Sequence, residues 1–216
     1  MQQDSWNFEE WNPSECLINV EKDTDNSGVE EKLDEIYKKF VDKTFVVIER
    51  IEETGLPKPG EQIRIITMRS FNSVHFLNYI AKKEKITNLY IAAFSINYEA
   101  SRFIDEMIKN GLIEKATILM SNLRNRAHRE KEQITRDMFV DNPNIDLFFA
   151  CSHAKIFSME TEKGNFYTIE GSGNLSYNSR IEQYSIDNDE GLFLFTKKWM
   201  DETKQFLKGK KELVLT

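Results

Sequence analysis

The pattern of apolar and polar positions changes near residue 60. Beyond that point, short runs rich in β-branched and aromatic residues alternate with longer stretches whose apolar residues recur three and four positions apart. The short runs predict strands and the longer stretches predict helices. We expect strands at residues 62–68, 88–96, 115–120, 145–151 and 192–195. We expect helices at residues 73–84, 98–110, 126–140 and 196–207. This alternation predicts an α/β fold, with a mixed, largely parallel sheet that carries helices on both faces.

The beginning of the chain follows a different pattern. Residues 1–28 are polar apart from a few early aromatic side chains, so they read either as an arm that docks on the rest of the protein or as a disordered tail. An apolar stripe at helical spacing predicts a helix at residues 29–43, and a β-branched run predicts a strand at 44–51. We therefore expect an N-terminal arm and helix over residues 1–45, followed by one domain over residues 46–216.

Composition indicates a globular, soluble protein. Hydrophobic residues make up 40% of the 216 residues and charged residues 30%, and no run approaches the roughly 18 apolar residues that predict a membrane-spanning helix. The first residues lack the basic and apolar regions of a signal peptide, and Cys16 and Cys151 are too few for a disulfide framework. We therefore expect a cytoplasmic location. The net charge of −7 argues against attraction of nucleic acid to the whole surface, but it allows a local basic patch.

Candidate chemistry is concentrated between residues 153 and 182. His153 and Lys155 are two positions apart, so on an extended strand their side chains share one face. After what reads as a two-stranded hairpin, residues 171–174 form the run G-S-G-N. An imidazole can attack phosphorus, an ammonium and an amide can hold its oxygens, and glycines allow backbone N–H groups to come close. Each fragment alone is a common surface pair or turn, but the two in this order indicate a phosphate site.

These residues resemble the HKD motif of the phospholipase D superfamily, usually written H-x-K-x4-D-x6-G-S-x-N. The matching residues are His153, Lys155, Gly171, Ser172 and Asn174. Glu160 stands where the motif has Asp, and ten residues rather than six separate it from Gly171. A lengthened hairpin tip at residues 161–168 absorbs the difference. Glu182 stands where many members of the superfamily have a second acid. The resemblance covers roughly residues 60–210.

The resemblance implies a phospholipase D-like α/β fold and phosphoryl transfer through a covalent phosphohistidine. His153 would be the nucleophile, Lys155 and Asn174 would hold the non-bridging oxygens, and Glu182 would fix the tautomer of the imidazole. The implied site comprises the catalytic residues His153, Lys155, Asn174, Glu182 and Ser172, with Gly171 and Gly173 as substrate-binding residues. We expect neither a metal nor another cofactor, because converging lysines and asparagines can neutralise the phosphate. Residues 46–216 would form the catalytic domain, which carries one HKD motif.

One motif supplies only half of the superfamily's usual pair of His-Lys units. The other histidines, His75 and His128, are not followed by a lysine two positions later, and the sequence contains no visible internal repeat. A complete site would therefore need a second copy of the chain. A homodimer with twofold symmetry brings the same surface of two subunits together, so we expect a site that is shared by two subunits.

A basic stretch lies at residues 121–136. It contains five basic residues and two acidic ones, which give a net charge of +3 in an acidic protein. Because it begins at the predicted end of a strand, where ligands of α/β sheets collect, we expect Arg124, Arg126 and Arg129 to bind phosphodiester backbone. The alternative is a solvated helix face whose charges pair with one another.

The phosphodiester that the sequence favours is nucleic acid, and DNA rather than RNA. A small chain with a single motif resembles the nucleases of the superfamily that act as dimers, and an apolar surface for lipid is not evident. The sequence therefore predicts a metal-independent phosphodiesterase, most simply an endonuclease, with no membrane partner. Two alternatives stay open, namely a nucleic-acid-binding protein that kept the fold without the activity, and a phospholipid phosphodiesterase.

Overall fold

The structure is a computed structural model that describes residues 51–67, 71–122, 133, 136–139, 142–176 and 181–214. Its strands are β1 (Gln62–Thr67), β2 (Ile86–Ala93), β3 (Ala116–Ser121), β4 (Ile145–Ala150), β5 (Ile156–Thr161), β6 (Phe166–Gly171) and β7 (Glu182–Asn188). Its helices are α3 (Val74–Lys83), α4 (Tyr98–Lys109) and α6 (Glu190–Val214). None of these helices is long and apolar enough to cross a membrane.

The strands form one sheet in the order β1-β7-β6-β5-β2-β3-β4. Only the pairs β2–β3 and β3–β4 are parallel, whereas β1–β7, β7–β6, β6–β5 and β5–β2 are antiparallel. The sheet is therefore mixed, as predicted, but the prediction that it is largely parallel is wrong. The reason is the place of the motif hairpin. β5 and β6 are inserted in the middle of the sheet, where a short hairpin connection forces its two strands to run in opposite directions.

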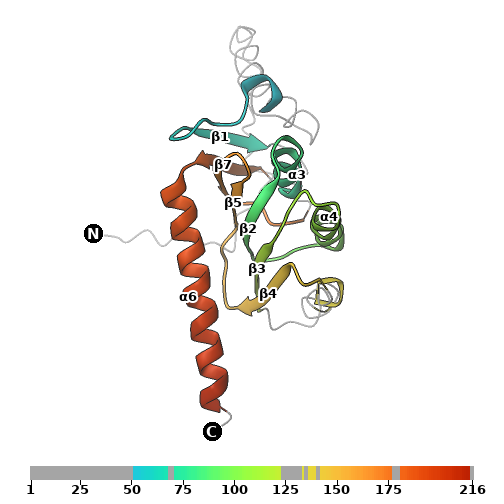
Figure 1. The fold of residues 1–216 in the computed structure, drawn as a ribbon, viewed down its shortest axis with the longest axis vertical. Coiled ribbons are helices and arrows are strands. Elements are labelled where there is room, and N and C mark those ends of the chain that lie inside the picture. The colour runs from blue at the N-terminus through green and yellow to red at the C-terminus, as the bar shows by residue number, and fades with distance from the viewer. Residues whose placement is uncertain are drawn as a thin grey trace, which may run out of the picture. The chain divides into compact units, whose positions relative to one another are not determined.

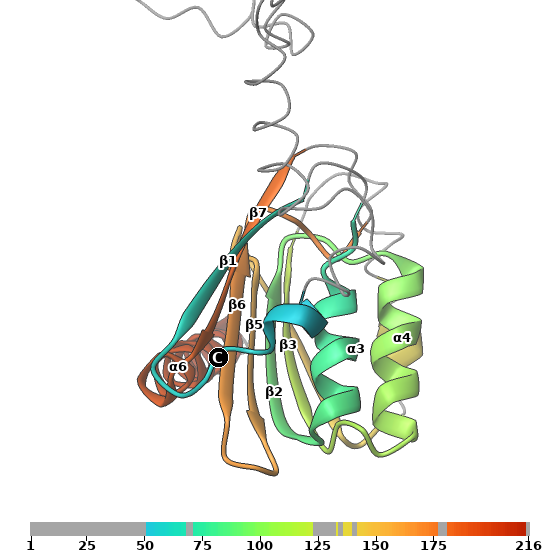
Figure 2. The same cartoon turned by 90° about the horizontal axis from the view of Figure 1, so that it is seen from above.

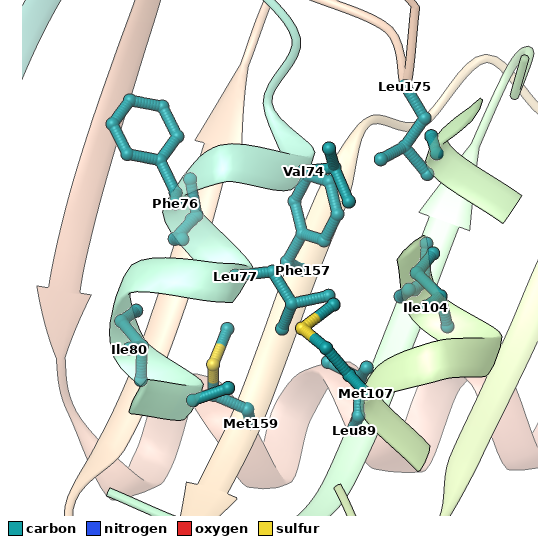
Figure 3. Close-up of a cluster of buried hydrophobic side chains, with 14 of the residues drawn as sticks. Val74, Phe76, Leu77, Ile80, Leu89, Ile104, Met107, Phe157, Met159 and Leu175 are labelled. Atoms are coloured by element: carbon teal, nitrogen blue, oxygen red, sulfur yellow. The ribbon is translucent and has the colours of Figure 1, made fainter. Parts of the chain in front are cut away.

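Helices cover both faces of the sheet, as the sequence predicted. α3 and α4 lie side by side on one face, and α6 crosses the other (Figure 1 and Figure 2). Because successive side chains of a strand point to opposite faces, Ile91 of β2 joins the core under α3 and α4, while Tyr90 joins the core under α6. The first of these cores is the larger one, and Figure 3 shows side chains of α3 and α4 meeting Phe157 and Met159 of β5.

The last strand was predicted in the wrong place. Residues 192–195 are helical and belong to α6, while the strand is β7, formed by residues 182–188. Asp189 begins the helix, because its side chain accepts a hydrogen bond from the backbone N–H of Leu192 at 2.8 Å. The alternation in β7 was hidden, because two of its buried positions, Glu182 and Asn188, are polar.

Two further predictions concern the ends of described segments. Residues 51–54 are helical, so the prediction that residue 51 ends a strand is wrong, and Gly55 follows them with a positive φ of 80°. Residues 133 and 136–139 are helical, as predicted for this region. The remaining residues of the predicted strand 44–51 and helix 126–140 lie outside the described part of the chain. The division of the chain at residue 45 also stays a prediction.

Buried polar side chains tie the tip of the β5–β6 hairpin to the rest of the fold. Glu84, which follows α3 and is 9% exposed, accepts hydrogen bonds from Thr161 Oγ1 at 2.7 Å and from Asn165 Nδ2 at 2.9 Å. Asn188, at the end of β7, donates to the carbonyl of Pro57 at 2.9 Å and to Asn165 Oδ1 at 3.0 Å. Each of these buried groups has a partner, which is the normal condition for polar atoms inside a protein.

We expect Asn188→Ala to destabilise the protein by about 2–4 kcal/mol, because it leaves the Phe166 N–H and the Asn165 Oδ1 without their partner in a buried site. Thermal unfolding should show a lower Tm. The control is Gln183→Ala, which truncates an exposed side chain of the same strand and should change stability by no more than about 0.5 kcal/mol. Equal melting temperatures for the two variants would contradict a structural role for this network.

Candidate active site

The predicted site residues lie along one edge of the sheet. Strands β2, β3, β4 and β6 end at this edge, and β5 and β7, which run the other way, begin there. The register agrees with this arrangement, because Ala92 near the end of β2 pairs with Ile156 at the start of β5, and Gly171 at the end of β6 pairs with Tyr184 near the start of β7. The carboxyl ends of parallel strands are where ligands of α/β sheets bind. The fold therefore brings both halves of the motif to the edge at which a ligand site is expected.

His153 and Lys155 lie together just before β5. Lys155 Nζ is 3.3 Å from His153 Nδ1 and donates to the His153 carbonyl at 3.4 Å. An ammonium can only donate, so Nδ1 accepts in this arrangement and the neutral ring carries its proton on Nε2. The two residues share a side of the chain, as predicted, but they stand in an irregular segment, because β5 begins only at Ile156. The imidazole is exposed and accessible to a ligand.

Phe94 is a neighbour of the imidazole that was not predicted from the sequence. It follows directly after β2, and its ring centroid is 4.4 Å from that of His153, with the two planes tilted by 57°. Lys155 Nζ lies 5.8 Å from the centre of the same ring. An aromatic face attracts cations at such distances, so Phe94 contributes to holding both groups. The available signal was its position immediately after a strand at the ligand edge of the sheet.

The run 171–174 is hydrogen-bonded into the sheet. The backbone N–H of Gly171 donates to the carbonyl of Lys155 at 3.4 Å, and that of Ser172 donates to the carbonyl of Gln183 at 3.0 Å. The first bond places the two halves of the motif next to each other. Both N–H groups are engaged by the protein, and the assignment of Gly171 and Gly173 to substrate binding stays a prediction.

Ser172 and Glu182 form a pair within the site. The Ser172 hydroxyl donates to Glu182 Oε2, and Ser172 Oγ accepts the backbone N–H of Gln183 at 3.1 Å. Glu182 is only 5% exposed, so its side chain is held in place at the base of the turn. Ser172 therefore orients the carboxylate, and its single proton is already donated.

The two glycines of the turn are required by packing. Neither has a positive φ, but a side chain at Gly173 would collide with the hydroxyl and ring of Tyr184, and one at Gly171 would collide with the same ring. Tyr184 is 4% exposed, and its ring packs at 5.8 Å from Phe71 and 5.1 Å from Phe76. Tyr184 was not predicted from the sequence, and its place two residues after Glu182 gave no signal.

Asn174 is held at the edge of the turn by its backbone. Its carbonyl accepts a hydrogen bond from Ser73 Oγ at 3.2 Å, at the start of α3. Its side-chain Oδ1 is buried and has no hydrogen-bond partner among the described residues. The amide is thus present at the predicted site, with one of its polar atoms unsatisfied.

Other candidates lie elsewhere. Glu160 accepts a hydrogen bond from Asn88 at 2.6 Å. It lies five residues after Lys155, and five residues of an extended strand span about 16 Å, so Glu160 is far from the His-Lys pair. His75 is half-buried between the rings of Phe71 and Phe103, and burial lowers its pKa. The predicted substrate-binding residues Arg124, Arg126 and Arg129, and also His128, lie outside the described residues.

The arrangement suits an anionic ligand with a reactive centre. An exposed imidazole stands beside an ammonium, and an amide and a buried carboxylate lie at the adjoining turn. A phosphate oxygen can replace the imidazole nitrogen as the partner of Lys155, because the ammonium has three protons to donate. Within the described residues, no three His, Cys, Asp or Glu side chains are grouped in a way that could hold a metal ion.

No protein-family model and no curated protein matches this chain. Among solved structures, a phospholipase D family member, Nuc from Salmonella typhimurium, is similar over 67% of this chain and 96% of its own, at 16% identity and a TM-score of 0.46. A polyphosphate kinase from Porphyromonas gingivalis is similar over 74% of this chain, at 12% identity and a TM-score of 0.46. A yeast tyrosyl-DNA phosphodiesterase is similar over 58%, at 14% identity and a TM-score of 0.36.

The chain spans 26% of the kinase and 32% of the tyrosyl-DNA phosphodiesterase. At these identities and TM-scores the likenesses carry no weight in assigning an activity. Function has to be inferred from the side chains at the edge of the sheet.

We expect Gly173→Ala to destabilise the protein by about 1–3 kcal/mol, because the new methyl group collides with a tyrosine whose buried ring is itself packed against Phe71 and Phe76. Chemical denaturation would measure the change. The matched control is Gly209→Ala in α6, where an added methyl meets nothing within 4 Å and should stabilise the helix by up to about 1 kcal/mol. If Gly173→Ala were as stable as this control, the turn would not be packed as described.

Proposed function

We propose that this chain is a metal-independent phosphodiesterase of the phospholipase D type, and that its substrate is nucleic acid. The observation that supports this most directly is the contact of Lys155 Nζ with His153 Nδ1. The G-S-G-N turn lies next to this pair, because the Gly171 N–H donates a hydrogen bond to the Lys155 carbonyl. A nucleophile and a cation are thus held together at the edge of the sheet where Asn174 also lies. The HKD resemblance supplies the reaction type.

In the first step, an imidazole nitrogen of His153 attacks phosphorus. A P–N bond forms, the P–O bond to the leaving group breaks, and the leaving oxygen takes a proton from His153 of the partner subunit. Lys155 and Asn174 hold the non-bridging oxygens, where negative charge concentrates in the transition state. The buried carboxylate of Glu182 favours the positive charge that develops on the phosphorylated imidazole.

In the second step, water cleaves the intermediate. His153 of the partner subunit, which has lost its proton to the leaving group, accepts one from the attacking water. The P–O bond to water forms as the P–N bond breaks, and His153 is released for another cycle. Ser172 contributes by holding Glu182, and Phe94 contributes by holding the imidazole.

Nucleic acid is the phosphodiester that the sequence favours, because a small chain with a single motif resembles the dimeric nucleases of the superfamily. The basic stretch at residues 121–136 begins at Ser121, the last residue of β3. Arg124, Arg126 and Arg129 are proposed to contact the backbone of DNA. Guanidinium groups match the geometry of phosphate oxygens, and each contact contributes to a dependence of binding on salt.

A homodimer is proposed because one chain supplies one His-Lys unit. Two apolar side chains near the site are exposed to an unusual degree for their type. Ile181, next to Glu182, is 63% exposed, and Ile66, which pairs with Gln183 across the β1–β7 ladder, is 39% exposed. Exposed apolar side chains beside an incomplete site support an interface at this edge.

We expect His153→Asn to reduce hydrolysis of a chromogenic phosphodiester by more than about a thousandfold in excess EDTA, because it removes the nucleophile. Lys155→Ala should lose about a hundredfold or more, because a cation on a transition-state oxygen is worth several kcal/mol.

The control is His75→Asn, which should retain activity. His75 belongs to α3 and packs against the rings of Phe71 and Phe103. Activity of His153→Asn near the wild-type level, at an unchanged Tm, would rule out the proposed nucleophile. A wild-type protein that binds DNA without cutting it would favour the non-catalytic alternative, and release of a lipid head group would favour a phospholipid substrate.

We expect light scattering to give twice the chain mass of 25.4 kDa, with an interface that buries at least about 1,000 Å². Mixing His153→Asn subunits into wild type should reduce activity more steeply than dilution does, because a heterodimer has one imidazole at its shared site. Subunits that carry Lys198→Ala on the exposed face of α6 should have no such effect. A monomer that is fully active at nanomolar concentration would contradict the shared site.

A further inference from the structure

Two buried polar atoms near the G-S-G-N turn have no hydrogen-bond partner among the described residues. One is the hydroxyl oxygen of Tyr184 and the other is Oδ1 of Asn174. Such atoms are rare in folded proteins, because the cost of removing each from water is not offset by a hydrogen bond. The polar network at the opposite end of the hairpin is satisfied, so the two unsatisfied atoms at the turn call for a functional explanation.

The two atoms are complementary and close along the chain. The Tyr184 hydroxyl can donate a proton, and Asn174 Oδ1 can only accept one. The hydroxyl lies against Gly173, as the collision of any side chain at that position shows, and Asn174 is the next residue. Consecutive Cα atoms are about 3.8 Å apart, so the Tyr184 hydroxyl is a close neighbour of Asn174.

Three other donors of the turn are already engaged. The backbone N–H of Gly171 donates to Lys155, and that of Ser172 donates to Gln183. The Ser172 hydroxyl donates to Glu182. The Ser172 hydroxyl thus already donates its proton, whereas the Tyr184 hydroxyl donates its proton to no acceptor within the described part of the chain.

The position and protonation of Tyr184 are both fixed. Its ring packs edge-on against Phe71 and Phe76, and it is 4% exposed, so the hydroxyl has little freedom to turn toward solvent. Burial, together with the negative charge of Glu182, raises the pKa of the hydroxyl, so it keeps its proton and remains a donor throughout the neutral range.

We propose that Tyr184 is a positioning residue for Asn174, whose side-chain Oδ1 accepts the Tyr184 proton when the Asn174 amide binds an oxyanion. The NH2 group of the amide then donates to the oxyanion, while Oδ1 is held by Tyr184. When an anion binds, both buried atoms thus gain a hydrogen-bond partner. The desolvation cost of the two unpaired atoms in the free protein is then relieved, which strengthens the binding of the anion. This inference rests on the proposed function only in assigning an oxyanion site to the turn.

The test compares Tyr184→Phe with wild type in thermal unfolding, with and without orthovanadate as the probe. Without vanadate, the variant should melt at or above the wild-type Tm, because it loses an unsatisfied hydroxyl and keeps the ring. With vanadate, its affinity should be about three- to tenfold weaker, as expected for one lost hydrogen bond, so its Tm should rise less.

The matched control is Tyr167→Phe. The Tyr167 hydroxyl interacts with Glu84 at the other end of the hairpin, where burial and then the charge of Glu84 raise its pKa to about 12. Removing this hydroxyl should lower the Tm of the free protein and leave the vanadate affinity unchanged. The two tyrosine variants are thus expected to differ in the direction of both effects.

A double-mutant cycle with Asn174→Ala tests whether Tyr184 acts through the amide. In the Asn174→Ala background, Tyr184→Phe should have no further effect on vanadate affinity, because the group that it positions has been removed. Additive losses would overturn the assignment of Tyr184 as a positioning residue for Asn174.

The remaining outcomes are also decisive. A lower Tm for free Tyr184→Phe would mean that the hydroxyl has a partner in the resting protein, and would overturn the inference. Equal vanadate affinities of wild type and Tyr184→Phe would overturn the inference and leave the proposed function intact. Failure of the wild-type protein to bind vanadate would overturn both.

Discussion

The site depends on the hydrogen-bonded register between β5 and β6. Ile156 pairs with Glu170, and the N–H of Gly171 continues the ladder to the carbonyl of Lys155. This places a lysine from one side of the hairpin next to a turn that lies sixteen residues later in the chain. Side chains alternate between faces along a strand, so a slip of one residue would turn each strand residue to the opposite face of the sheet. The central position of the hairpin, with β2 on one side and β7 on the other, fixes this register.

The two ends of the hairpin illustrate a division between stability and function. At the tip, Glu84, Asn165 and Asn188 satisfy one another's hydrogen-bonding groups in a buried site. At the other end, Asn174 and Tyr184 retain unsatisfied atoms, and His153 is exposed. A protein that binds an anion must keep donors and acceptors available for it, and these groups reduce the stability of the free form. The network at the tip anchors the hairpin that presents them.

Aromatic packing supports the polar groups of the site. Phe94 lies against the imidazole, and Tyr184 fills the space that two glycines leave open. The glycines of the G-S-G-N run are therefore a consequence of the tyrosine on the neighbouring strand, and their conformation is one that other residues could adopt. The same packing restricts the motion of the turn, so Ser172 and Glu182 are held as a pair. Polar groups that must act together are positioned here by rings that carry no charge.

The sequence alone determined the local features of this protein. Periodicity identified most helices and strands, and the spacing of His153, Lys155 and residues 171–174 identified the candidate chemistry, because each of these signals lies within one element or one hairpin. The tertiary structure decided what depends on partners distant in the chain. The order of the strands made the sheet mostly antiparallel, and β7 was hidden by its buried polar residues. Tyr184 comes from β7 and Phe94 follows β2, so no local pattern could reveal that they pack against Gly173 and His153.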